Sequence, residues 1–117
     1  MKLLWGFLLA ASPLWAGPLK ITFVGDIMLD ELPGNVIKRG QDPFAHVASS
    51  LKADRLRIGN LECVVATTGT AVIKPVVFQA HPRVLPSVAK YFDAVSIANN
   101  HSGEYGKGAF VEMLGYL

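Results

Sequence analysis

The sequence predicts an α/β domain in which helices pack on a mostly parallel sheet. Strand-like and helix-like segments alternate along the 117 residues, 51% of the residues are hydrophobic, and a polar group follows each predicted strand. Alternating strands and helices form layers of this kind. A charged fraction of 17% and a mean hydropathy of +0.36 exclude a disordered chain. The net charge of +2 indicates no nucleic-acid partner, and one cysteine excludes an internal disulfide.

The first half of the chain predicts one strand and one helix. Residues 19–24 alternate and are rich in β-branched side chains, so we expect a strand that closes at Gly25 and Asp26. Asp42 is placed to cap a helix that has Pro43 at its first position. Its apolar face is formed by residues at helical spacing: Phe44, Val47, Ala48 and Leu51.

The second half of the chain continues the alternation. In order, we expect a short strand over residues 55–58, a hairpin or extended loop over 63–77, a helix opening at Pro82, a buried strand over 92–98 and a helix over 108–117. The last helix has no capping or stop signal before the final residue. We therefore expect residues 17–117 to be the N-terminal portion of a larger domain.

Polar residues at the predicted strand ends form the candidate site. Ligands of α/β sheets bind beyond the carboxyl ends of the strands, where Asp26, Glu62, Asn100 and His101 would converge. Carboxylates brought together repel unless a cation lies between them, and these ligands suit Mn²⁺, Zn²⁺, Mg²⁺ or iron. A histidine there could protonate a leaving oxygen. Each residue also has a simpler interpretation, as a turn, a helix cap or a surface histidine.

The remaining histidines and the cysteine predict no chemistry. His46 falls within the predicted helix and His81 precedes Pro82, so both are interpreted as structural or exposed. Cys63 follows Glu62, but no histidine or aspartate at useful spacing marks it as a nucleophile. A small buried thiol is the better interpretation.

The first sixteen residues have the order of a secretory signal peptide. A positive start at Lys2 precedes an apolar run over residues 3–11, and Ala16 offers a small residue for cleavage. The run is too short for a membrane span, although an uncleaved anchor is the alternative. We expect an exported protein of the periplasm or cell envelope, with residues 17–117 as its domain.

Three ordered motifs resemble the CapA-type capsule synthesis (poly-γ-glutamate biosynthesis) family. They are the segments 23–29, 59–62 and 98–102, and the resemblance covers the chain from about Leu19 onward. That family is similar to the calcineurin-like metallophosphoesterases, which implies a four-layer α/β sandwich with two metals at the strand ends.

The resemblance also implies roles for individual residues. Asp26, Glu62 and Asn100 resemble metal ligands, and His101 resembles the catalytic or phosphate-binding histidine. Met28 stands where many relatives have a histidine ligand, and Glu104 stands where the family usually has an aspartate. With Met28 in place of a histidine, these residues alone offer too few ligands for a two-metal site.

Three functions stay open on this basis. The first is a secreted, metal-dependent hydrolase that acts on a phosphoester or an anionic polymer and works with other cell-envelope assembly partners. The second is a non-catalytic envelope component that binds such a polymer, which the methionine at position 28 favours. The third is a truncated product without activity of its own.

Overall fold

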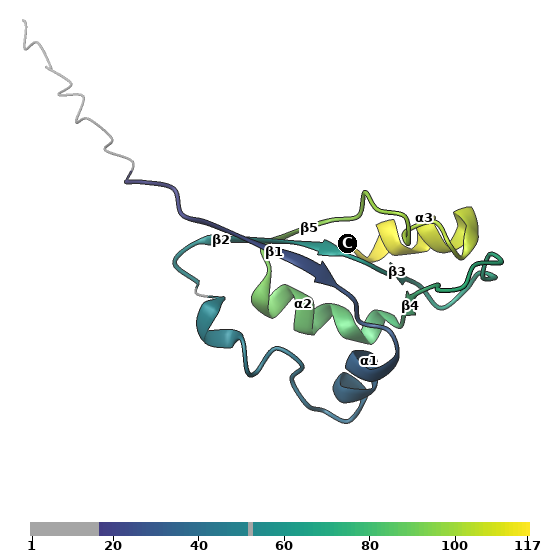
Figure 1. Ribbon diagram of the computed structural model, residues 1–117, viewed down its shortest axis with the longest axis horizontal. Helices are drawn as coiled ribbons and strands as arrows, with labels where there is room; N and C mark the ends of the chain where they lie inside the picture. The colour runs from purple at the N-terminus through teal and green to yellow at the C-terminus, as the bar shows by residue number, and fades with distance from the viewer. Residues whose placement is uncertain (1–16, 52) are drawn as a thin grey trace, which may run out of the picture.

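A three-stranded parallel sheet forms the centre of the domain. The computed structural model describes residues 17–51 and 53–117, and the predicted signal peptide lies outside them. Strands β1 (Ile21–Ile27), β2 (Leu56–Leu61) and β5 (Ala94–Ser96) lie in the order β1-β2-β5 (Figure 1). All pairings are parallel, which confirms the predicted α/β class. Within the described ranges, no helix has the length and apolar content needed to cross a bilayer.

The helices leave one face of this sheet open. Helices α1 (Glu31–Lys38) and α2 (Leu85–Tyr91) lie on one side of the sheet, and α3 (Gly106–Tyr116) lies beyond its end (Figure 1). Short 3-10 helices η1 (Ala48–Ser50) and η2 (Pro82–Val84) complete the helical elements of the described chain. The helix expected from Pro82 and the last predicted helix are confirmed, each with shifted ends.

Strand β1 is longer than the sequence predicts. It continues through Gly25 and Asp26 to Ile27, and its register with β2 shifts between Phe23 and Asp26. An irregularity of this kind lets a strand pass a glycine without ending. Its consequence is that Asp26 pairs with Asn60 and shares a sheet face with it.

The predicted helix after Asp42 is wrong, and a helix before it was missed. Asp42 Oδ1 accepts a hydrogen bond from the Phe44 amide at 2.9 Å, but this capping bond leads only into turns and η1. Its Oδ2 accepts from Lys90 and Tyr91 of α2, so contacts distant in sequence fix the segment. Conversely, α1 forms around Pro33 because its first turn needs no amide donor there.

The buried core lies between the sheet and the helices. Its most completely buried large side chains are Leu61, Met113, Val64, Val65 and Val84. Val64–Val65 form β3, which pairs in parallel with β4 (Gln79–Ala80). The segment between them is therefore an extended loop, and the hairpin alternative is wrong.

The uncovered sheet face is apolar over β1 and the start of β2. Phe23 is 72% exposed, and Ile21 pairs in register with Leu56, both also exposed. Strand β5 was expected to be buried, but Ala94 and Ser96 are exposed because they lie in register with Ile58 and Asn60 on the open face. The candidate site lies at the carboxyl end of this open face.

Candidate functional site

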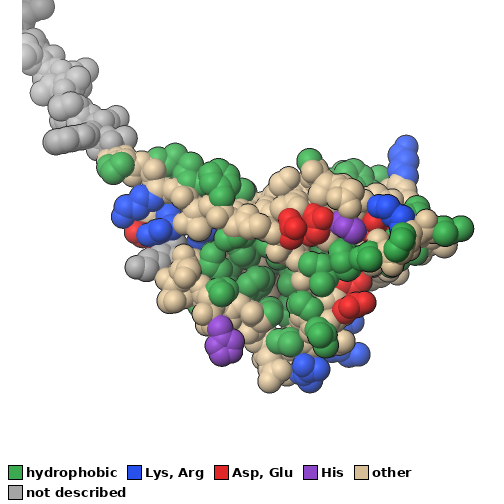
Figure 2. Space-filling model, viewed as in Figure 1, with side chains coloured by type: hydrophobic (Ala, Val, Ile, Leu, Met, Phe, Trp, Pro, Cys, Tyr) green, Lys and Arg blue, Asp and Glu red, His purple; other side chains and the backbone are tan. Residues whose placement is uncertain are grey.

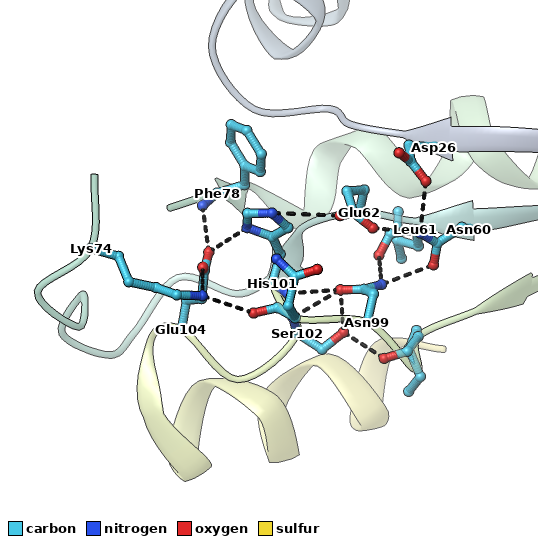
Figure 3. A network of polar contacts seen from close by, with 12 residues as sticks. Asp26, Asn60, Leu61, Glu62, Lys74, Phe78, Asn99, His101, Ser102 and Glu104 are labelled. Carbon is cyan, nitrogen blue, oxygen red and sulfur yellow. Dashed lines mark hydrogen bonds and ion pairs between the residues drawn. The ribbon is translucent and has the colours of Figure 1, made fainter. Parts of the chain in front are cut away.

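The ends of β1 and β2 bring Asp26 and Glu62 together, and Asn60 connects the two carboxylates. Asn60 lies opposite Asp26 in the sheet register, and Glu62 follows β2 directly. The Asn60 amide group donates to Asp26 Oδ1 at 2.8 Å and also to Glu62 Oε2 (Figure 3). An amide N–H₂ thus joins two carboxylates that would otherwise repel each other.

Asn99 connects the strand ends to the turn that carries the histidine. Its Nδ2 donates to Asn60 Oδ1 and to the Leu61 carbonyl, both at 2.9 Å. Its Oδ1 accepts from the amides of His101 at 3.0 Å and Ser102 at 3.1 Å. This is an Asx-type turn, which holds the backbone of residues 99–102 in one conformation.

His101 lies between two glutamates. Its Nδ1 is 2.7 Å from Glu104 Oε2, and its Nε2 is 3.5 Å from Glu62 Oε1 (Figure 3). The imidazole also packs on Phe78, with ring centroids 4.7 Å apart. Because the ionised Glu104 only accepts, Nδ1 carries the proton and Nε2 faces the strand ends.

Glu104 is a buried carboxylate with three donors. It is 2% exposed and accepts from Lys74 Nζ at 2.7 Å, from His101 and from the Phe78 amide at 3.1 Å. Burial alone would raise the pKa of Glu104, but these hydrogen bonds outweigh it and hold the pKa below its ordinary value. The carboxylate is therefore charged near neutral pH, and it can stabilise a protonated His101.

Three of the four predicted site residues, Asp26, Glu62 and His101, lie in one network. The fourth, Asn100, is exposed, and its carbonyl accepts from Lys74 Nζ at 3.3 Å. Figure 2 shows acidic side chains and a histidine close together on this face, with hydrophobic side chains exposed nearby.

Sequence reasoning did not assign roles to Asn60, Asn99 or Lys74. The two asparagines lie within the motifs 59–62 and 98–102, and an asparagine in a turn commonly accepts from the backbone amide two residues on. Lys74 gave no signal, because its partner Glu104 lies 30 residues further along the chain.

The described residues do not complete a metal site. In the ranges 17–51 and 53–117, no three His, Cys, Asp or Glu side chains are grouped to hold an ion. The Asn60 amide lies between the two candidate carboxylates with its N–H₂ group, and its oxygen faces Asn99. Met28, at the position of an expected ligand, accepts from the Asp30 amide at 3.3 Å through sulfur. Further donors would be needed for a bound cation.

The remaining candidates behave as expected. Cys63 is fully buried, and burial raises the pKa of its thiol to about 11, which makes it a poor nucleophile. His46 and His81 are exposed, and His81 Nδ1 accepts from the Arg83 amide at 3.1 Å to cap η2. The interpretations of all three are confirmed.

Comparison with known families agrees with the geometry and the motifs. The family described as bacterial capsule synthesis protein matches residues 20–117, which includes every element of the fold. No curated protein matches the chain. The match covers the motifs at Asp26, Glu62 and His101, on which the resemblance was based. The chain belongs to the bacterial capsule synthesis protein family.

Proposed function

We propose that the chain is a hydrolytic component of capsule synthesis, in which His101 transfers a proton during cleavage of a phosphoester or another bond of an anionic polymer. The observation that carries this proposal is the position of His101 between buried Glu104 and Glu62. A histidine held by a carboxylate at one nitrogen, with the other nitrogen left to exchange a proton, is a common proton-transfer arrangement.

The residues of the network support separate roles. Nε2 of His101 is the atom that would exchange a proton with the substrate, and Glu104 would balance the charge of the doubly protonated ring. Glu62, 3.5 Å from Nε2, would orient the substrate or a water molecule beside that nitrogen. Asn60 and Asn99 would hold the Glu62 carboxylate and the turn that carries His101 in fixed positions relative to each other.

The divalent cation stays a prediction. Asp26, Glu62 and Asn100 are its predicted ligands, and the described His, Cys, Asp and Glu side chains do not form a group of three that could hold it. A metal would supply a polarised oxygen or an activated water, but none of the roles above depends on it. Calorimetric titration with Mn²⁺ tests this point: binding that weakens in Asp26→Asn supports the cation, and absence of binding refutes it.

Two further predictions accompany this function. The layered sandwich is supported by the exposed apolar side chains of Ile21, Phe23 and Leu56, which a second layer would cover. Export to the periplasm or envelope rests on the order of charge and hydrophobicity in residues 1–16. N-terminal sequencing of the exported protein tests this prediction, which expects Gly17 as the first residue.

A non-catalytic, polymer-binding role is the alternative, and the incomplete metal donor set favours it. An experiment separates the two with bis(4-nitrophenyl) phosphate and poly-γ-glutamate as probes. The hydrolase proposal expects cleavage of at least one probe, reduced about 100-fold or more in His101→Asn. Binding of the polymer without cleavage of either probe would support the alternative and overturn the hydrolase.

A further inference from the structure

The loop between β3 and β4 is hydrogen-bonded to Glu104, which follows the turn that carries His101. The Val72 amide donates to the Glu104 carbonyl at 2.8 Å, which fixes the backbone of the loop. Two residues later, Lys74 reaches the side-chain carboxylate of the same glutamate at 2.7 Å. The backbone bond is independent of the lysine, so the loop remains attached when only the Lys74 ammonium is removed.

Lys74 restrains the orientation of the Glu104 carboxylate. Its Nζ bonds Oε1, while Oε2 is shared by His101 Nδ1 and the Phe78 amide. A carboxylate held at both oxygens cannot rotate without breaking charge-assisted hydrogen bonds, which are the strong ones. Without Lys74, Oε1 would be a buried acceptor lacking its cation, and that restraint on the carboxylate would be lost.

The orientation of His101 depends on that carboxylate. The imidazole has Glu104 at Nδ1, Phe78 against its face and Glu62 beyond Nε2 (Figure 3). A turn of the Glu104 carboxylate would displace Oε2, which is the acceptor at Nδ1, and would release the ring from its position between Phe78 and Glu62.

We propose that Lys74 is a positioning residue that acts through Glu104 to hold His101 with Nε2 directed at Glu62. This inference rests on the proposed function for its catalytic meaning, since His101 is the proton-transfer group there. Lys74 itself is 41% exposed and acts from the surface of the site. Lys74 fixes the orientation of Glu104, and His101 transfers the proton.

The test compares Lys74→Met with Lys74→Arg in the full chain. Lys107→Met is the matched control, because Lys107 is an exposed lysine on α3. The first readout is the NMR signal of the His101 ring protons, which the Phe78 ring current shifts. We expect loss of that shift and of the Phe78–His101 cross-peaks in Lys74→Met, recovery in Lys74→Arg and no change in Lys107→Met. The backbone amide spectrum reports whether the fold is retained.

The second readout is turnover of whichever probe the wild type cleaves. We expect kcat to fall about 10-fold in Lys74→Met at unchanged KM, as for other residues that orient a functional side chain. An unchanged His101 ring signal in a folded Lys74→Met would overturn the inference, whatever the activity. Absence of cleavage by the wild type would instead count against the proposed hydrolase, while the ring signal would still decide the role of Lys74. If Lys74→Met unfolds, the same measurement is made on Lys74→Gln. Loss of the Phe78 ring-current shift of the His101 protons in folded Lys74→Gln supports the inference, and a signal identical to that of the wild type overturns it.

Discussion

Replacing Glu104 with glutamine should destabilise the domain far more than its small change in shape suggests. Oε1 accepts from Lys74, and Oε2 accepts from both His101 and the Phe78 amide. A glutamine offers one oxygen and one N–H₂ group, so in either orientation its N–H₂ group faces a donor. At least one hydrogen bond to a charged group is lost, and each such bond contributes about 1.5–3 kcal/mol.

We therefore expect Glu104→Gln to lower the free energy of unfolding by about 2 kcal/mol at neutral pH. Urea unfolding followed by far-ultraviolet circular dichroism measures it, and the shift of the midpoint at constant slope gives the change. Glu31→Gln, an exposed acid in the first turn of α1, serves as the control and should change stability by less than about 0.5 kcal/mol. Equal midpoints for the two variants would refute the description of Glu104 as the central acceptor.

Three other predictions concern the fold around the site. The Arg57 guanidinium lowers the pKa of Asp93 to about 2, so this pair stabilises the fold above pH ~4 and is lost as the pH falls through 2. Acid unfolding should accordingly be less steep in Asp93→Asn, and an unchanged profile would contradict the assignment. Leu61→Ala, at a fully buried position between two site residues, should cost about 2–5 kcal/mol in urea unfolding, and a loss below 1 kcal/mol would indicate a loosely packed strand end. Cys63 should react with Ellman's reagent only after unfolding, because it is buried and its pKa is raised to about 11; rapid labelling of the native chain would show that the core opens readily.

Local signals in the sequence were sufficient for the sheet and for most of the site. The alternation of residues 19–24 and the polar groups after the strands located β1, β2 and the edge where Asp26, Glu62 and His101 gather. Errors arose where contacts distant in sequence override local preference. Asp42 has the features of a helix cap, but its bonds to Lys90 and Tyr91 fix a segment of turns.

The details of the site depended on the same distant contacts. Which asparagine of the pair 99–100 points to the strand ends depends on the backbone turn, which no local pattern specifies. The role of Glu104 depends on Lys74, brought close by the loop between β3 and β4. The register shift in β1 that places Asp26 beside Asn60 also arises from pairing with β2.

The proton positions on the histidines test the central claim most directly. His101 Nδ1 faces the carboxylate of Glu104 and should carry the proton, whereas His81 Nδ1 accepts from the Arg83 amide and should not. Long-range ¹⁵N–¹H correlation spectra of the labelled chain distinguish the two tautomers. The structure predicts opposite tautomers for His101 and His81, with the His101 tautomer lost in Glu104→Leu, which has no acceptor for Nδ1. A His101 protonated at Nε2 alone, or one insensitive to Glu104→Leu, would contradict the claim that a buried glutamate orients this histidine for proton transfer.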